Sequence, residues 1–361
     1  VNGKRAREYN VTIRLNIPVF GANFLKGTVY DYSSTSGSIY PDFTGALTRG
    51  SAFDGEYVLI VSRVGGTKPH LLKVSDVKNN VIAPINLDIT NITAGTYTIH
   101  SGALANGHVY IADLSGGLAS PLKIYYWDTP ASTPQVILNI DKNTIPGSGA
   151  RHGDNMSVNI DSNGNGYIYF GDNAATQILR FTVTNHTTVS QPTILPTFAG
   201  AKATAYMSYN RIEDTSDYIF TGFYAPIALA NESGTISYTM GTTSTPERGS
   251  DARVLTFNKE RYLIMCTAAR TTGDNPPALF VYNLTKGESV KEAMELFDAR
   301  ADKVADYSYS LGGQINTSPA TQTGYYIEKD DDGNDSKLYL YAASCDAGFT
   351  IFEFPIKTQE D

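Results

Sequence analysis

The chain repeats one pattern of hydrophobic and polar positions from end to end. In its clearest copy, the apolar run at 167–170 follows an Asn- and Gly-rich turn at 161–166, and a second apolar run lies at 178–183. Short runs of β-branched and aromatic residues bounded by Asn, Asp and Gly are typical of antiparallel strands joined by tight turns. The pattern therefore predicts a hairpin at this place.

Six apolar runs follow such turns, and they divide the chain into repeats. The runs begin at Tyr57, Val109, Tyr167, Tyr218, Tyr262 and Leu338, so the spacings are 52, 58, 51, 44 and 76 residues. A strand precedes each turn, another follows each run, and a fourth closes most repeats, as at 83–87 and 135–138. About four strands in roughly 40–50 residues is the size of one propeller blade.

We therefore predict an all-β fold, a β-propeller of four-stranded antiparallel blades. Radial stacking around an axis buries both apolar faces of each sheet and leaves only short edges. The last repeat lacks a fourth strand, and the N-terminal segment has an unassigned strand at 10–17 or at 27–30. We expect an N-terminal strand to close the ring in the last blade. This arrangement gives six blades, with seven as the alternative if 24–43 forms its own sheet.

The expected domain boundary falls at residue 44. Residues 1–44 form an N-terminal segment with the closing strand, or the remnant of a preceding sandwich domain, and 45–361 form the propeller. The 76-residue interval contains a helical pattern at 289–301, with a capping box of Ser289 and Glu292 and an apolar stripe on one face. We predict one surface helix there, between the fifth and sixth blades and docked on a blade.

Composition and charge exclude several classes of function. The net charge at pH 7 is -8 and no basic stripe offsets it, which argues against a nucleic-acid partner. No apolar run approaches the ~20 residues that span a bilayer. We expect Cys266 and Cys345 to be buried free thiols. The chain begins at Val1 without an initiator Met, so we expect that a signal segment was removed.

The connections that lead into the innermost strands concentrate polar residues. In a propeller these connections surround one mouth of the central channel, so residues far apart in sequence would meet there. The candidate ligand-binding residues of this group are Arg49, His100, Arg151, His152, Asp154, Arg248 and Asp251. Arginine binds carboxylates with two hydrogen bonds, so the group would suit an anionic or hydroxyl-rich ligand. The structural alternative is that Arg–Asp pairs clamp adjacent blades.

Two aromatic residues extend this candidate site. Trp127 ends a predicted strand, and Tyr206 lies near another strand end. Exposed rings stack on sugar faces, and a tyrosine hydroxyl also bonds to sugar hydroxyls. Most of the tyrosines are nevertheless expected to pack between blades, where aromatic residues on strands usually lie.

No motif predicts a cofactor, a metal or a catalytic residue. The acidic turns at 161–166 and 330–335 resemble the start of a calcium loop, but the second lacks the Glu that such a loop needs, and both lie where a hairpin turn is expected. No nucleophile elbow is present. A glycosidase whose two carboxylates come from distant blades stays open, with Asp154 and Asp251 as first candidates.

Three segments resemble a family of secreted bacterial propellers of unknown function. They are 112–128, with its run PLKIYYWD, 154–159 (DNMSVN) and 166–170 (GYIYF). The likeness spans most of residues 45–356. The family comes from polysaccharide-using Gram-negative gut bacteria, and it is similar to surface lipoproteins with a small N-terminal sandwich domain. The resemblance implies an outer-membrane surface lipoprotein or a periplasmic protein, and it supplies no catalytic residues.

The sequence thus predicts a non-catalytic extracytoplasmic binding protein that recognises a glycan or glycoprotein at the channel mouth. Two alternatives stay open, a glycan hydrolase or lyase on a propeller scaffold and a protein-interaction platform in a surface complex. We expect a monomer with no nucleic-acid partner and no membrane span in this chain.

Overall fold

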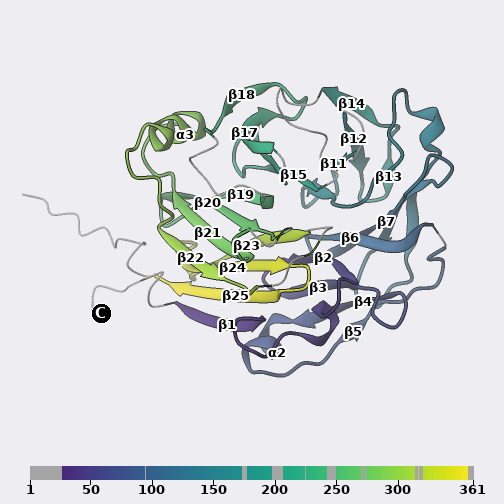
Figure 1. Ribbon diagram of the computed structural model, residues 1–361, viewed down its shortest axis with the longest axis horizontal. Coiled ribbons are helices and arrows are strands. Elements are labelled where there is room, and N and C mark those ends of the chain that lie inside the picture. The colour runs from purple at the N-terminus through teal and green to yellow at the C-terminus, as the bar shows by residue number, and fades with distance from the viewer. Residues whose placement is uncertain are drawn as a thin grey trace, which may run out of the picture.

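Six antiparallel sheets surround one axis in the computed structural model (Figure 1). The structure describes residues 27–93, 95–172, 177–196, 206–223, 225–241, 249–269, 271, 274–313, 316 and 320–356. Each sheet contains four strands in a row, and one carries an additional strand. The predicted all-β propeller with six blades is confirmed.

The first five blades follow one another along the chain. In each blade the strands are given from the innermost outwards. The first blade contains β2 (Thr48–Phe53), β3 (Tyr57–Ser62), β4 (Lys68–Lys73) and β5 (Ile85–Asn86), and the second contains β6 (Tyr97–Ala105), β7 (His108–Leu114), β8 (Leu122–Trp127) and β9 (Gln135–Ile140). The third blade contains β10 (Ser157–Ile160), β11 (Gly166–Gly171), β12 (Gln177–Thr184) and β13 (Thr188–Val189), and β14 (Thr193–Pro196) also pairs with β12.

The fourth blade contains β15 (Met207–Arg211), β16 (Asp217–Gly222), β17 (Ala225–Asn231) and β18 (Ile236–Thr239). The fifth contains β19 (Gly249–Phe257), β20 (Glu260–Thr267), β21 (Ala278–Asn283) and β22 (Tyr307–Ser310).

The sixth blade joins the two ends of the described chain. Its inner strands are β23 (Thr321–Lys329), β24 (Asp335–Ser344) and β25 (Gly348–Pro355), and β1 (Thr28–Ser33) pairs antiparallel with β25 on the outside. Closure by an N-terminal strand is therefore confirmed. The closing strand is the later of the two candidates, and the earlier one at 10–17 lies outside the described residues. The domain boundary at residue 44 stays a prediction.

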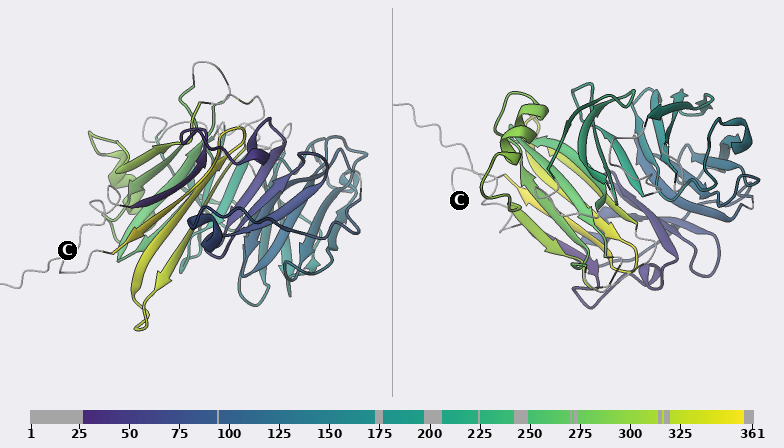
Figure 2. Two further views of the ribbon diagram at one scale, coloured as in Figure 1. Left: turned by 90° about the horizontal axis from the view of Figure 1, so that it is seen from below. Right: turned by 45° about the horizontal axis from the view of Figure 1, so that its top comes forward.

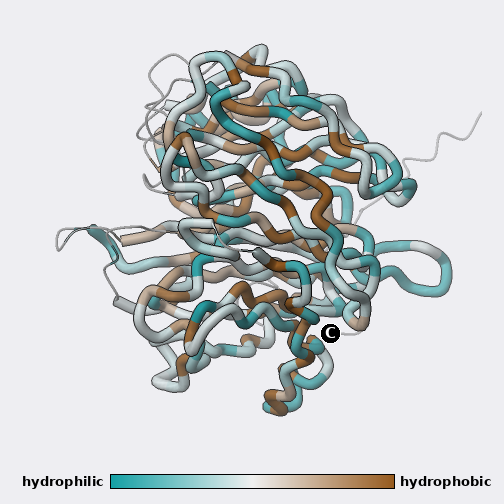
Figure 3. Tube along the Cα trace, turned by 90° about the vertical axis from the view of Figure 1, so that its right-hand side faces the viewer, coloured by the Kyte–Doolittle hydropathy of each residue, from teal (hydrophilic) through white to brown (hydrophobic). Residues whose placement is uncertain are grey.

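Apolar side chains fill the spaces between neighbouring blades. Each of six buried clusters joins two adjacent sheets, as where Ile219 of the fourth blade packs with Val254 and Leu263 of the fifth. Figure 3 shows apolar segments along the strands and hydrophilic segments in many of the connections between them. Burial of both faces of every sheet is what makes the radial arrangement stable.

Helix α3 (Val290–Asp298) confirms the predicted surface helix and its cap. The Ser289 side chain accepts a hydrogen bond from the Glu292 N–H at 3.1 Å, and the buried face contains Val290, Met294 and Phe297. Its place differs from the prediction, because α3 lies between β21 and β22 within the fifth blade. The outer strand β22 has the sequence YSYS, and this short run was not recognised as a strand.

Three shorter helices complete the description. They are η1 (Pro41–Phe43), α2 (Val74–Lys78) and η2 (Lys142–Thr144). Among the helices of the described chain, none is long and apolar enough to cross a membrane. Cys266 and Cys345 are both free and buried, as expected.

Candidate functional site

The inner strands of the six blades define two mouths of the ring. At the loop mouth, each inner strand begins after the connection from the preceding blade. At the hairpin mouth, each inner strand ends in a tight turn that leads to the second strand. Figure 2 shows the hairpin of β23 and β24 extending beyond the other blades on this second side. The two mouths differ in shape and in charge.

A cavity of about 1030 Å³ opens at the hairpin mouth. Residues from all six blades line it, at 53–56, 104–107, 158–161, 211, 213, 214, 253 and 324–326. The cavity therefore lies on the axis of the ring, which is the usual place for a ligand site in a propeller. Its position opposite the predicted mouth is the main finding that the sequence did not provide.

Charged side chains dominate the polar lining of this cavity. They are Asp54, Glu56, Asp161, Glu213, Asp214, Arg211 and Arg253. Five carboxylates face two guanidinium groups, which leaves three negative charges in excess. Such an excess disfavours a negatively charged ligand and favours a neutral or cationic one.

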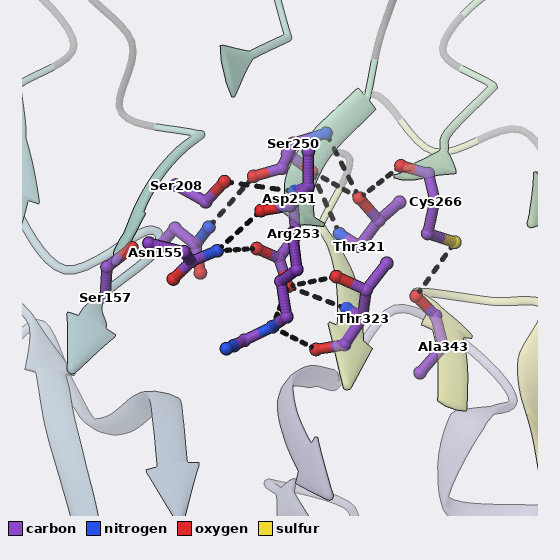
Figure 4. A network of polar contacts seen from close by, with 12 residues as sticks. Asn155, Ser157, Ser208, Ser250, Asp251, Arg253, Cys266, Thr321, Thr323 and Ala343 are labelled. Atoms are coloured by element: carbon purple, nitrogen blue, oxygen red, sulfur yellow. Dashed lines mark hydrogen bonds and ion pairs between the residues drawn. The ribbon is translucent and has the colours of Figure 1, made fainter. Parts of the chain in front are cut away.

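Arg253 offers free donors to the cavity. Its Nε donates to the Thr323 carbonyl at 3.0 Å and lies 3.9 Å from Asp251 Oδ2, while 34% of its side chain is exposed. Within the described part of the chain, its two terminal nitrogens have no hydrogen-bond partner. Figure 4 shows the guanidinium extending away from the polar cluster around Asp251. A ligand in the cavity can therefore take both terminal nitrogens.

Two tyrosines of β23 form the apolar part of the lining. Burial, together with a hydrogen bond to the Glu213 carboxylate, raises the pKa of Tyr325. Tyr326 is 43% exposed, and its ring lies directly on Gly55, where a Cβ atom would be 2.2 Å from the ring. Gly55 also has a positive φ of 93°, so the turn requires a glycine. The Tyr326 ring packs in the space that the missing side chain leaves.

The loop mouth brings together five of the predicted residues. Arg151 Nε donates to Asp154 Oδ2 at 2.7 Å, its Nη2 donates to Asp154 Oδ1, and Nη2 also reaches the Tyr206 hydroxyl at 3.3 Å. His100 Nε2 lies 3.9 Å from Asp154 Oδ1. Burial raises the pKa of Asp154, and the bonded Arg151 and nearby Arg49 oppose that shift. Arg49, His100, Arg151 and Asp154, with Tyr206, thus share one end of the ring.

Two further residues at the loop mouth were missed by the sequence. The Arg63 guanidinium lies over the Tyr97 ring, with Cζ 4.0 Å from its centroid, and the ring of Tyr97 stacks on His100 at 6.3 Å. Burial lowers the pKa of His100 well below its usual value, and Arg63, Arg49 and Arg151 lower it further. His100 is therefore neutral, and three guanidinium groups act on it.

Asp251 lies in the wall between blades and only 5% of it is exposed. Its Oδ1 accepts a hydrogen bond from Asn210 Nδ2 at 2.7 Å, and its Oδ2 accepts from the N–H and the hydroxyl of Thr323 at 2.7 and 3.0 Å (Figure 4). These bonds connect the fourth, fifth and sixth blades. The geometry assigns Asp251 a structural role of the clamping kind that the sequence left open.

Two other predicted residues, Trp127 and His152, do not face either mouth. Trp127 is fully buried between the first two blades and donates from Nε1 to the Asp88 carbonyl at 3.0 Å. His152 is also fully buried, with Nε2 3.5 Å from Asp172 Oδ2. Arg248 lies outside the described residues. Within the described residues, no group of three or more His, Cys, Asp or Glu side chains is placed to hold a metal ion.

The six sheets around one axis define the protein as a six-bladed β-propeller. The chain belongs to the family described as a domain of unknown function (DUF4623), whose profile matches residues 1–357. A DUF4623 family protein from Bacteroides eggerthii has a crystal structure that is similar over 96% of this chain and 78% of that chain, with 46% identity and a TM-score of 0.88. The predicted resemblance to a bacterial propeller family of unknown function is confirmed to this extent.

Two further solved structures are less similar to this chain. A calcium-binding protein, regucalcin, from Agrobacterium tumefaciens is 13% identical with a TM-score of 0.47, covering 91% of this chain and 93% of that chain. AofleA from Arthrobotrys oligospora is 11% identical with a TM-score of 0.48, covering 91% and 86%. No curated protein matches the sequence.

Proposed function

We propose that the protein is a non-catalytic binding propeller that holds a neutral glycan in the axial cavity at the hairpin mouth. The observation that supports this proposal is the cavity itself, with a volume of about 1030 Å³ and a lining drawn from all six blades. Pockets that enclose small ligands are usually of about 300–1,000 Å³, so this one suits a ligand of several linked rings.

The lining has the donors and acceptors that sugar hydroxyls need. A hydroxyl both donates and accepts, so it pairs with carboxylates as acceptors and with guanidinium groups as donors. Asp161 and Glu56 supply acceptors, and Arg253 supplies two nitrogens that have no hydrogen-bond partner within the described residues. The excess of carboxylates favours a neutral glycan over an acidic one.

Tyr326 provides the stacking surface for a sugar ring. One face of the ring is fixed against Gly55, and 43% of the residue is exposed at the rim. A ring that is already held in place loses little side-chain entropy when a ligand stacks on it. The sugar would thus stack on Tyr326 while its hydroxyls reach the charged groups.

A glycan array followed by titration calorimetry tests the proposal. We expect a neutral glycan to bind and Tyr326→Ala to lower its affinity by about tenfold, the size of a lost stacking contact. Tyr97→Ala is the matched control, because Tyr97 is similarly exposed, at 47%, but lies at the loop mouth. Absence of any glycan ligand, or equal effects of the two substitutions, would contradict the proposal.

One observation supports hydrolysis as a second candidate function. Asp54 lines the cavity, and burial raises the pKa of its carboxyl group despite hydrogen bonds from the N–H groups of Glu56 and Tyr57 at 3.0 and 2.8 Å. Glycosidases pair a carboxyl of raised pKa, which acts as the acid, with an ionised one, and the direction of the Asp54 shift is that of the acid. Release of reducing ends from a bound glycan, lost in Asp54→Asn with binding retained, would establish this function. A bound glycan that stays intact would exclude it.

We also propose that the protein acts outside the cytoplasm, at the outer-membrane surface or in the periplasm. The support is the relationship to a protein of Bacteroides eggerthii. Protease treatment of intact cells, followed by detection of the chain, tests this location. Protection of the chain in intact and osmotically shocked cells alike would contradict it.

A further inference from the structure

We propose that the loop mouth holds a second binding site, which takes a carboxylate group of an acidic sugar or a small organic acid. The site is centred on Arg63, a half-buried guanidinium at the end of the ring opposite the axial cavity. This proposal does not rest on the glycan site, because different residues and a different charge carry it.

Arg63 has no carboxylate partner among the described residues. Its Cζ lies 4.0 Å over the Tyr97 ring, and its Nε is buried without a hydrogen-bond partner in the described part of the molecule. A buried donor of a charged group costs free energy when it is left unpaired. The Nε is too buried for a ligand to reach, so an oxyanion from outside would bind the other nitrogens of the same guanidinium.

Neighbouring charges add to the demand for an anion. Burial lowers the pKa of Arg63, and the nearby charge of Arg49 lowers it further, so two like charges lie close together. Arg151 is also close, but its Nε and Nη2 already bind Asp154, which is fully buried. Asp346 also lies at this mouth, where it binds the Ala46 N–H and Asn316, but neither it nor Asp154 forms an ion pair with Arg63 in the described part of the chain.

The centre of this positive field is His100, which cannot supply a counter-charge. The His100 residue is 4% exposed, and its imidazole Nδ1 has no hydrogen-bond partner within the described residues. Ser101, the next residue of β6, has a buried hydroxyl that also lacks a partner there. These two groups are buried beyond the reach of a ligand, so the part of the site that an anion can contact is the Arg63 guanidinium.

A carboxylate fits this place better than a neutral polyol. A guanidinium presents a planar pair of N–H donors that matches the two oxygens of a carboxylate. The opposite mouth carries three excess negative charges and would repel the same group. The two ends of the ring are therefore suited to ligands of different charge.

Titration calorimetry with galacturonate and with malonate, each against sodium chloride of equal ionic strength, tests the site. We expect saturable binding of at least one acid at pH 7, and a loss of about tenfold or more in Arg63→Gln. Arg63→Lys keeps the charge but loses the paired donors, so it should bind at an intermediate level. Tighter binding of galacturonate identifies an acidic sugar as the source of the carboxylate, and equal or tighter binding of malonate identifies a small organic acid.

Arg180→Gln is the matched control. Arg180 also lies over a tyrosine, with Cζ 4.7 Å from the Tyr167 ring, and also has a buried Nε without a described partner, but it belongs to the third blade. Its replacement should leave acid binding unchanged. If neither acid binds, or if folded Arg63→Gln and Arg63→Lys bind as the unmodified chain does, the site does not exist. Binding of a neutral glycan at the other mouth should be the same in all of these variants.

Discussion

Asn210 and Asp251 bind each other across the boundary between the fourth and fifth blades, with Nδ2 2.7 Å from Oδ1. Their strands β15 and β19 belong to different sheets, so no backbone ladder joins them. The same boundary has a second contact, because the Ser208 hydroxyl accepts the Ala252 N–H at 3.1 Å. Short polar side chains thus take the place of a ladder on this side of the ring. These polar contacts between inner strands therefore hold adjacent blades together along the wall of the channel.

Replacement of Asp251 by Ala should strongly destabilise the ring. The change removes the acceptor of the Thr323 N–H and of one N–H of the Asn210 amide, whose Nδ2 keeps the Ala252 carbonyl at 2.8 Å, and each buried group left without a partner costs about 1–3 kcal/mol. We expect a loss of about 3 kcal/mol in the free energy of unfolding, measured by urea denaturation. Asp302→Ala, at an exposed position, should change it by less than about 0.5 kcal/mol. Equal effects of the two substitutions would show that the clamp does not stabilise the fold.

The first two blades use close contact in place of polar side chains, and this predicts the effect of Gly50→Ala. A Cβ atom at Gly50 would lie 2.6 Å from the His100 carbonyl and 2.8 Å from the Gly102 nitrogen, so β2 and β6 would have to separate. We expect a loss of about 2–4 kcal/mol, as for overpacking against backbone. Gly117→Ala is the control, because nothing lies within 4 Å of a Cβ atom there. A thermal melt of Gly50→Ala that matches this control would contradict the argument.

Much of the fold could be predicted from the sequence, because each repeat has to present two apolar faces and a tight turn. The missing fourth strand after β25 indicated the closure, and Ser289 with Glu292 indicated the start of α3. The place of α3 could not be predicted, since β22 is a four-residue run of alternating Tyr and Ser whose partner is distant in sequence. Pairing between strands, unlike periodicity, is a tertiary property.

The candidate site was less predictable than the fold. Equivalence of the repeats predicted that Arg49, His100 and Arg151 would meet, and the structure places both arginines near His100. It could not show that Trp127 points into the core. The residues of the hairpin mouth have the sequence of ordinary turns, since Asp, Asn and Gly are favoured there for backbone reasons. These turns also line one axial cavity, but that depends on how the six blades are spaced around the axis. No short sequence pattern indicates it.

Acid should destabilise the protein in part through His152. Burial lowers the pKa of this ring from 6.5 to about 4, with Asp172 opposing the shift and Lys142 adding to it. The folded state therefore binds fewer protons than the unfolded state between about pH 4 and pH 6.5, so stability from this group is full above that window and falls as pH drops through it. Relative to His152→Gln, the unmodified chain should lose about 2 kcal/mol between pH 7 and pH 4.5.

Urea denaturation of both chains across this range measures that difference. Burial also raises the pKa of Asp113, to about 7, and this group acts in the opposite direction because its stability contribution is lost as pH rises. Both chains contain Asp113, so its effect cancels in the comparison. A parallel pH dependence of the two chains would show that His152 titrates normally.

The closing strand β1 should be essential, while the residues before it should not be needed for the ring. β1 pairs with β25 over six residues, from Thr28 opposite Glu353 to Ser33 opposite Gly348, and the Tyr309 hydroxyl of the fifth blade donates to Asp31 at 2.5 Å. Deletion of residues 1–33 exposes the whole edge of β25, and an unpaired edge of this kind promotes association between chains. We expect the shortened chain to aggregate or to unfold at a temperature at least about 10 °C lower. Deletion of residues 1–26 keeps β1 and is the matched control. This control should stay folded, as measured by size-exclusion chromatography and circular dichroism. Similar behaviour of the two deletions would mean that the sixth blade is stable with three strands.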